Sequence, residues 1–314
     1  MVKKLLIIMG PTATGKSSLA LKLAKKCQAP IINFDSLLFY RELNIGSAKP
    51  TKDELSLAKH FFVDIASIKN PLNAADFSEQ ARYKIEELFQ TTSSIIAVGG
   101  SGFYLQALLY GMFESLTVSE DVKEKIRHMK SLAGPEGLRE YLKNNDPESF
   151  QRYHQNDQYR IERAVEHHLM TGTKMSDVRD KLDQIKSKTP LYKNLGWDIL
   201  PLYLDIDKQQ HFEIIQKRTE SMIELGLIDE VKDLLTRGFR GEEKPLQSIG
   251  YKETLAFLRG EYSREELSER ISINTRKLAK AQRTWFSKVE KTSFNPLRDQ
   301  AKIEKVVEKF FENK

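Results

Sequence analysis

Residues 2–17 read VKKLLIIM followed by GPTATGKS. The first eight residues end in a continuous apolar run, which is typical of a fully buried parallel strand. The next eight match the pattern G-x-x-x-x-G-K-[ST] at each fixed position, and a helical pattern begins at Ser17. A strand, a glycine-rich turn and a helix in this order predict an α/β fold with a phosphate-binding loop. This P-loop comprises Gly10, Pro11, Thr12, Ala13, Thr14, Gly15, Lys16 and Ser17.

Further apolar runs lie at 30–34, 95–98 and 199–204, and helical patterns separate them. Strands that alternate with helices predict a parallel sheet with right-handed crossovers, similar to the core of P-loop NTPases. The last run contains Pro201, which donates no hydrogen bond to a neighbouring strand. We therefore expect this proline at the edge of the sheet or at the start of its strand.

The character of the chain changes between about 116 and 194, where charged helical segments carry few strand-like runs. We interpret 116–194 as a helical insertion domain. The catalytic core would then be discontinuous and consist of 1–115 and 195–314. Helical patterns around 208–237, 250–259, 263–290 and 301–312 predict that the C-terminal part is almost wholly helical.

The composition excludes several classes of protein. Of the 314 residues, 40% are hydrophobic and 30% are charged, which is enough apolar material for a folded core. No apolar run approaches the roughly 20 residues of a membrane span, so we expect a cytoplasmic protein without membrane contact. The single cysteine, Cys27, excludes an internal disulfide. The net charge of +6 favours a polyanionic partner.

The P-loop supplies backbone N–H groups for phosphate oxygens, Lys16 adds a charge, and the Ser17 hydroxyl is placed for Mg²⁺. An NTPase normally adds a carboxylate at the end of a second strand to hold this ion. The run at 95–98 ends instead in Gly99-Gly100-Ser101. This ending argues against an NTPase and leaves a small-molecule kinase as an alternative.

Asp35 follows the apolar run at 30–34, so it should lie at the same edge of the sheet as the P-loop. A carboxylate there has two functional interpretations: it accepts a proton from a nucleophile, or it holds Mg²⁺ through water. A third interpretation is structural, because Asp35 or Ser36 can cap the turn that follows. The spacing does not choose among the three.

Taken together, these segments resemble the bacterial tRNA dimethylallyltransferases, also called tRNA isopentenyltransferases. The resemblance covers nearly the whole chain in the expected order. Its most specific parts are Ile45 to Pro50 and Gly250 to Glu253. The similar segments are Gly10–Ser17, Asp35–Ser36, Tyr40–Arg41, Ile45–Pro50, Asp64–Ile65, Ala75–Phe77, Val98–Tyr104, Asn156–Asp157, Arg160–Ala164, Thr171–Gly172, Ile249–Glu253 and Thr275–Gln282.

The resemblance implies transfer of a dimethylallyl group from dimethylallyl diphosphate to the exocyclic amine of the adenosine just 3′ of a tRNA anticodon. The P-loop would then hold a prenyl diphosphate, which agrees with the missing carboxylate after 95–98. Asp35 would be the general base, and Ser101 would help to hold the diphosphate. Lys16 and Ser17, with Mg²⁺ as the cofactor, would stabilise the departing diphosphate.

The resemblance also implies where tRNA binds. Asp35, Ser36, Leu37 and Leu38 would lie where the target base enters, beside Ser101. The segment Tyr159, Arg160, Ile161, Glu162 and Arg163 matches a family segment that touches tRNA, and Gln247 and Gly250 would help to shape the base pocket. Lys123 aligns with a position that is often arginine in the family, and lysine keeps the charge but loses the bidentate contact.

The segment 270–288 has six basic residues and no acidic residue. Arg276, Lys280 and Arg283 follow i, i+4, i+7 and should share one helical face, opposite an apolar stripe that includes Leu278 and Trp285. Charged faces of one sign are less usual on solvated helices than mixed ones. We interpret this segment as a surface for tRNA or diphosphate.

Two other functions stay open on the sequence. A transferase that prenylates a free adenine nucleotide would share the core, but it would need neither the insertion nor the basic helix. A P-loop kinase or NTPase would need a carboxylate that the third apolar run does not supply. We expect the main activity in a monomer with tRNA and dimethylallyl diphosphate as its partners.

Overall fold

The computed structural model describes residues 2–112, 118–188 and 190–312. The chain forms two compact units. The core unit consists of Met1–Gly111 and Leu195–Lys314, and the inserted unit consists of Met112–Asn194.

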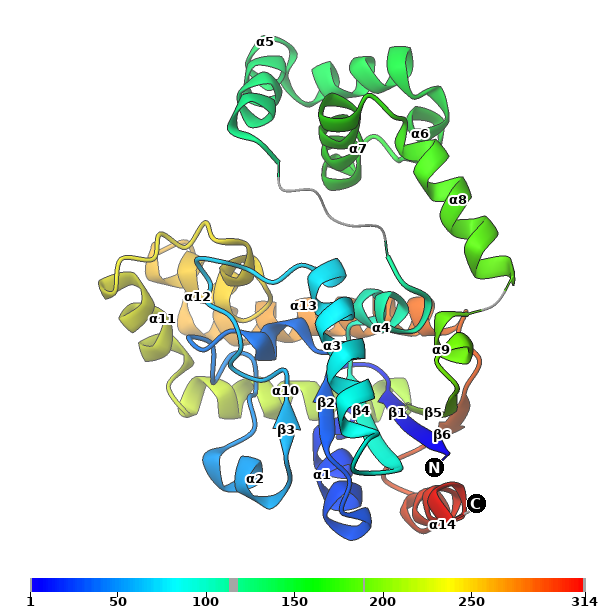
Figure 1. Cartoon of the computed structure of the whole chain (residues 1–314). Coiled ribbons are helices and arrows are strands. Elements are labelled where there is room, and N and C mark those ends of the chain that lie inside the picture. The colour runs from blue at the N-terminus through cyan, green and yellow to red at the C-terminus, as the bar shows by residue number, and fades with distance from the viewer. Residues whose placement is uncertain (1, 113–117, 189, 313–314) are drawn as a thin grey trace. The chain divides into compact units, whose positions relative to one another are not determined.

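The core unit contains a six-stranded sheet with the order β3-β2-β4-β1-β5-β6 (Figure 1). All five strand pairs are parallel, so the predicted α/β core with a parallel sheet is confirmed. The two outer strands were not predicted, because no apolar run as long as those at 30–34 or 95–98 marks them. The strands are β1 (Lys3–Met9), β2 (Ile31–Asn33), β3 (His60–Phe61), β4 (Ser94–Gly99), β5 (Trp197–Leu204) and β6 (Thr292–Phe294).

The expectation for Pro201 needs a correction. Its strand, β5, lies inside the sheet between β1 and β6 and does not form the edge. The proline is tolerated there because β6 pairs with β5 only from Leu202 to Leu204, just after the proline. β6 therefore does not pair with Pro201, and the missing N–H of the proline costs no hydrogen bond between β5 and β6.

Helices cover both faces of the sheet. On one face, α1 and α14 bury apolar side chains against Leu6, Ile8 and Leu202. Because neighbouring residues of a strand point to opposite faces, Tyr203 of β5 lies on the other face, where its ring is 5.9 Å from that of Phe286 in α13. The helices of the core unit are α1 (Lys16–Cys27), α2 (Lys52–Leu57), α3 (Ala74–Leu88), α4 (Gly102–Tyr110), α10 (Lys208–Glu224), α11 (Leu227–Thr236), α12 (Tyr251–Leu258), α13 (Arg264–Phe286) and α14 (Gln300–Glu312), with two 3-10 turns, η1 (Ser36–Phe39) and η2 (Lys244–Gln247).

Helices are the only regular elements among the described residues of the inserted unit, which has its own apolar core. Val122, Leu138, Ile161 and Val165 are fully or almost fully buried in it. Its longest helix is interrupted at Gly134, whose φ of 59° lies in the left-handed region. The helices are α5 (Glu120–Asn145), α6 (Pro147–Arg152), α7 (Gln158–Thr171), α8 (Met175–Lys188) and α9 (Leu191–Asn194). No helix of the described residues is long and apolar enough to cross a membrane.

The register of the central strands brings the predicted site residues to one edge. Met9 at the end of β1 pairs with Gly99 at the end of β4, and Asn33 at the end of β2 pairs with Val98. The turns that follow these three strands therefore begin side by side. This is the carboxyl edge of a parallel sheet, where α/β proteins bind ligands.

Candidate active site

The P-loop is held tightly against the sheet and against its own lysine. A Cβ on Gly10 would lie 2.3 Å from the carbonyl oxygen of Leu204, so only glycine fits where the loop passes β5. The carbonyl oxygen of Pro11 accepts hydrogen bonds from Lys16 Nζ at 2.6 Å and from Thr14 Oγ1 at 2.9 Å. These bonds close the loop around the start of α1.

Lys16 is buried at the start of α1. Its burial lowers its pKa to about 8, with the Asp35 carboxylate acting in the opposite direction and Arg218 in the same one. An ammonium group with this pKa is mostly charged at neutral pH, and a bound polyanion would favour the charged form further. The side chain therefore suits electrostatic contact with a diphosphate.

Asp35 caps the turn that follows it and also faces the site. Its Oδ1 accepts a hydrogen bond from the N–H of Leu37 at 3.3 Å, which is the capping role that the sequence left open. Its Oδ2 is oriented toward the Gly-Gly-Ser corner, since a Cβ on Gly100 would lie 3.8 Å from it. Next to this carboxylate, Ser36 N–H donates to Ser101 Oγ at 3.4 Å. One carboxylate oxygen thus has a structural partner, and the other faces the site.

Arg218 of α10 is a site residue that the sequence analysis did not single out. Its Nη1 lies 3.5 Å from Thr12 Oγ1 in the P-loop. Burial lowers its pKa and the Asp35 carboxylate opposes that shift, so the guanidinium lies within electrostatic reach of the carboxylate. A signal was present in the sequence: His211, Ile215 and Arg218 follow i, i+4, i+7 and share the face of α10 that packs inward.

Gln282 of α13 joins the P-loop to the Gly-Gly-Ser corner. Its Oε1 accepts from Thr12 N–H at 2.8 Å, and its Nε2 donates to Gly100 O at 2.9 Å. The sequence analysis placed Gln282 at the end of a family-like segment but gave its amide no role, because it considered only the charged and apolar faces of this helix. Both strand-end turns are thus fixed by one side chain from the C-terminal part of the chain.

This bridge gives a testable prediction for Gly100→Ala. The added Cβ would lie 2.7 Å from Gln282 Nε2, so the amide must move and lose its bonds. We expect the KM for the phosphate-containing substrate to rise roughly two- to tenfold, the effect of about one net hydrogen bond. Gln282→Leu should have a similar effect, and the double variant should be no worse than either. Additive effects in the double variant would contradict this explanation.

The basic residues predicted along α13 do not form one face. Arg276 and Lys280 are exposed, and the Arg276 guanidinium lies 5.2 Å from the ring centre of Phe212. Arg283 is directed inward, where it forms a salt bridge with Asp205 at 2.7 Å. The predicted apolar stripe is not fully packed either, because the side chain of Leu278 is 39% exposed. We therefore limit the expected RNA contact of these three to Arg276 and Lys280.

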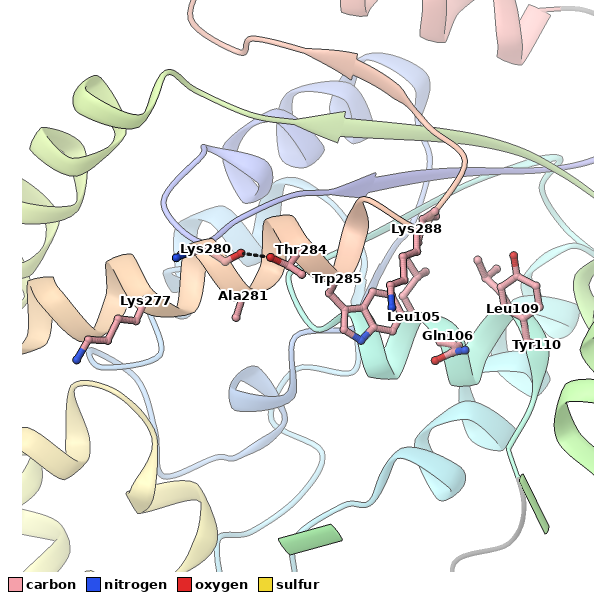
Figure 2. Close-up of a pocket in the computed structure, with 11 residues that line it drawn as sticks. Leu105, Gln106, Leu109, Tyr110, Lys277, Lys280, Ala281, Thr284, Trp285 and Lys288 are labelled. Atoms are coloured by element: carbon pink, nitrogen blue, oxygen red, sulfur yellow. Dashed lines mark hydrogen bonds between the residues drawn. The ribbon is translucent and has the colours of Figure 1, made fainter. Parts of the chain in front are cut away.

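A cavity of about 690 Å³ lies between α4 and α13. Figure 2 shows the side chains that line it, with Trp285 and Lys288 beside Leu105 of α4 and with Lys277 and Lys280 further along α13. An aromatic and aliphatic wall with lysines suits the bases and phosphates of a single-stranded nucleic acid. The lining residues are Leu105, Gln106, Leu109, Tyr110, Lys277, Lys280, Ala281, Thr284, Trp285, Lys288 and Val289.

The remaining predicted tRNA residues differ in exposure. In the inserted unit, Ile161 is buried in the apolar core, whereas Tyr159, Arg160 and Arg163 are exposed on α7. Lys123 is also exposed and pairs with Glu120. We therefore narrow the predicted tRNA contact of residues 159–163 to the exposed side chains of Tyr159, Arg160 and Arg163.

In the core unit, Leu38 and Gly250 are buried, while Ser36 and Leu37 are partly exposed. Gln247 is exposed, and its amide donates to the carbonyl oxygen of Gly241. Leu38 is a buried residue of η1, the turn that Asp35 caps, and Gly250 precedes α12 with a φ of 95°. We therefore do not expect either residue to contact tRNA directly.

A P-loop with a buried lysine, an arginine beside it and a carboxylate that faces the same edge is the arrangement of a P-loop protein suited to bind a phosphate compound next to a carboxylate. The sheet lacks a carboxylate after β4, since that strand continues into Gly100 and Ser101. The arrangement is that of a P-loop transferase rather than of an NTPase.

The family model for IPP transferase matches residues 38–289. The chain is 39% identical to tRNA dimethylallyltransferase 1 of Trichlorobacter lovleyi over 91% of each chain. It is 37% identical to tRNA dimethylallyltransferase 2 of Geotalea uraniireducens over 91% of this chain and 89% of the relative. This chain belongs to the tRNA dimethylallyltransferase (IPP transferase) family.

Solved structures agree with this assignment. The full-length tRNA isopentenylpyrophosphate transferase from Bacillus halodurans aligns with a TM-score of 0.69 and 29% identity over 99% of this chain and 97% of that one. A eukaryotic dimethylallyltransferase acting on tRNA aligns with a TM-score of 0.81 and 24% identity over 99% of this chain and 80% of that one, which shows the fold alone.

Proposed function

We propose that this protein transfers a dimethylallyl group from dimethylallyl diphosphate to the N6 amine of the adenosine immediately 3′ of a tRNA anticodon and releases diphosphate. The observation that carries the proposal is the convergence of Lys16, Arg218 and Asp35 on the P-loop in a member of this family. Two cations suit the diphosphate, and the carboxylate suits an amine that loses a proton.

The reaction breaks the bond between C1 of the dimethylallyl group and the diphosphate oxygen, and it forms a bond from C1 to N6. Negative charge accumulates on the diphosphate, where the P-loop amides, Lys16 and Arg218 stabilise it. The N6 proton passes to Asp35 Oδ2, since Oδ1 already accepts from Leu37. An aromatic amine is a weak nucleophile, so holding it in line with C1 supplies much of the rate.

Mg²⁺ fits the donors of this site. The Ser17 hydroxyl is exposed at the first turn of α1, next to the loop that would hold the diphosphate. Mg²⁺ usually keeps several waters and binds through one or two protein oxygens together with substrate phosphates, so a dense carboxylate cluster is not required. When bound, the ion would neutralise charge on the leaving diphosphate. Ser17 would contact it directly, and Asp35 through water.

The RNA part of the proposal rests on the cavity between α4 and α13. An enzyme that modifies a base must take that base out of its stack and hold the flanking backbone. Trp285 offers a stacking surface, and Lys277, Lys280 and Lys288 line the same cavity. Exposed Arg276 extends this charged surface along α13.

The proposal is tested by transfer of labelled dimethylallyl diphosphate, with Mg²⁺, to three acceptors: an unmodified tRNA with adenosine 3′ of its anticodon, AMP and ATP. We expect label in the tRNA alone. Label in AMP or ATP would assign the chain to prenylation of free nucleotides. Turnover of ATP without transfer would assign it to P-loop kinase or NTPase chemistry.

Replacement of Arg276 and Lys280 by alanine should weaken tRNA binding and reduce its salt dependence. Each lost phosphate contact removes about 0.7 to 0.9 units from the slope of log K against log salt, so the double variant should lose about 1.5 units. The measurement is a tRNA-binding titration at several salt concentrations. The matched control replaces Lys305 and Lys309, two exposed lysines of α14, a helix that ends at the opposite edge of the sheet beside Lys4. An equal loss of slope in the control would mean that the effect comes from the net charge of the protein and not from tRNA contacts of Arg276 and Lys280.

A further inference from the structure

The main chain of Thr12 in the P-loop is held by side chains from two distant helices. Gln282 of α13 accepts from its N–H at 2.8 Å, and His211 of α10 lies with Nε2 2.8 Å from its carbonyl oxygen. His211 is 1% exposed. His211 thus contacts the P-loop from a position that solvent hardly reaches.

The hydrogen bonds of His211 fix its protonation state. A carbonyl oxygen can only accept, so Nε2 carries the proton that it donates to Thr12. On the other side, Nδ1 lies 2.8 Å from Nη2 of Arg283, and a guanidinium can only donate, so Nδ1 is unprotonated. Arg283 is oriented in turn by Asp205, whose Oδ1 accepts from both Nε and Nη2. His211 is therefore neutral and oriented, with both ring nitrogens in use.

The residue after Thr12 is strained. Ala13 has a φ of 61°, in the left-handed region that residues with a Cβ avoid. A flip of the peptide between Thr12 and Ala13 would bring Ala13 back to negative φ and turn the Thr12 carbonyl away from His211. Because the carbonyl and the N–H of a trans peptide point in opposite directions, the same flip would reverse the Ala13 N–H.

We propose that His211, oriented by Arg283 and Asp205, is a positioning residue that holds the peptide between Thr12 and Ala13 so that the Ala13 N–H faces the diphosphate. The inference rests on the proposed function only for the identity of the diphosphate ester, since any diphosphate bound by this loop would be affected. The cost of a left-handed alanine is comparable to the strength of one hydrogen bond. One bond from His211 is thus enough to decide between the two peptide orientations.

The test compares two substitutions of His211 in two backgrounds. His211→Leu fills a similar volume without hydrogen bonds. His211→Gln can donate to the Thr12 carbonyl from Nε2 and can accept from Arg283 at Oε1. Ala13→Gly removes the left-handed penalty, because glycine adopts positive φ readily. The readout is the affinity for inorganic diphosphate with Mg²⁺, measured by calorimetry on the full chain, with thermal unfolding of every variant as the check of folding.

We expect His211→Leu to weaken diphosphate binding about tenfold, and His211→Gln to keep most of the affinity. In the Ala13→Gly background, the penalty of His211→Leu should shrink to about threefold or less, because the peptide no longer needs to be held. An equal penalty in both backgrounds, or equal losses in the leucine and glutamine variants, would show that His211 only fills space. Failure of dimethylallyl transfer by the wild type would instead overturn the proposed function and leave this result unaffected.

Discussion

Replacement of Asp35 by asparagine is expected to lower turnover by a factor of about 10² or more, the usual cost of a missing general base, while tRNA still binds. Asparagine keeps an Oδ1 that can accept from Leu37 N–H, so the cap of η1 is preserved. The substitution removes only the group that can take the N6 proton. Single-turnover transfer of labelled dimethylallyl diphosphate, together with a tRNA-binding titration, measures both quantities.

Asp35→Ala is the matched comparison, because it removes the cap and the base together. An active asparagine variant beside an inactive alanine variant would mean that Asp35 serves only as a cap. Titration with Mg²⁺ distinguishes a general base from a residue that holds the metal through water. If Asp35 only helps to hold Mg²⁺, excess Mg²⁺ should restore part of the turnover of Asp35→Asn. A lost base is not restored by metal.

Lys16→Met is expected to lower kcat/KM for dimethylallyl diphosphate by about 10² to 10³, because a preorganised cation is removed from the place where negative charge develops. Methionine has a similar length and no charge. The Lys16 amine lies inside the closed P-loop, bonded to Pro11 O at 2.6 Å, so a water molecule has little room to replace it. Steady-state kinetics of transfer and calorimetry with inorganic diphosphate measure the loss.

The control for Lys16→Met is Lys25→Met, on the solvent side of the same helix. It changes the net charge by the same amount without touching the P-loop, and it should retain wild-type kinetics. Unchanged affinity of Lys16→Met for diphosphate would mean that this loop is not where the diphosphate binds. Binding of tRNA should be retained in both variants, because neither lysine lies on the α13 surface.

Local patterns were sufficient to predict the centre of the fold. The apolar runs that became β1, β2, β4 and β5 are long enough to stand out, and the glycine spacing of the P-loop is a backbone requirement that the sequence states directly. Asp35 was placed at the site because parallel strands end at one edge. β3 and β6 were not predicted because they lack such a run. Pro201 was misplaced because the partners of a strand depend on segments far away in the chain.

The sequence by itself determined the phosphate-binding loop, the parallel sheet and the carboxylate at its edge, since each depends on neighbouring residues and backbone geometry. Only the tertiary structure decided which side chains surround Thr12. His211 and Gln282 lie 199 and 270 positions from it. Helical periodicity indicates which face of α10 or α13 is buried but not what it is buried against. For this reason Arg283, predicted to contact RNA from its charge, proved to be paired with Asp205 and His211 inside the protein.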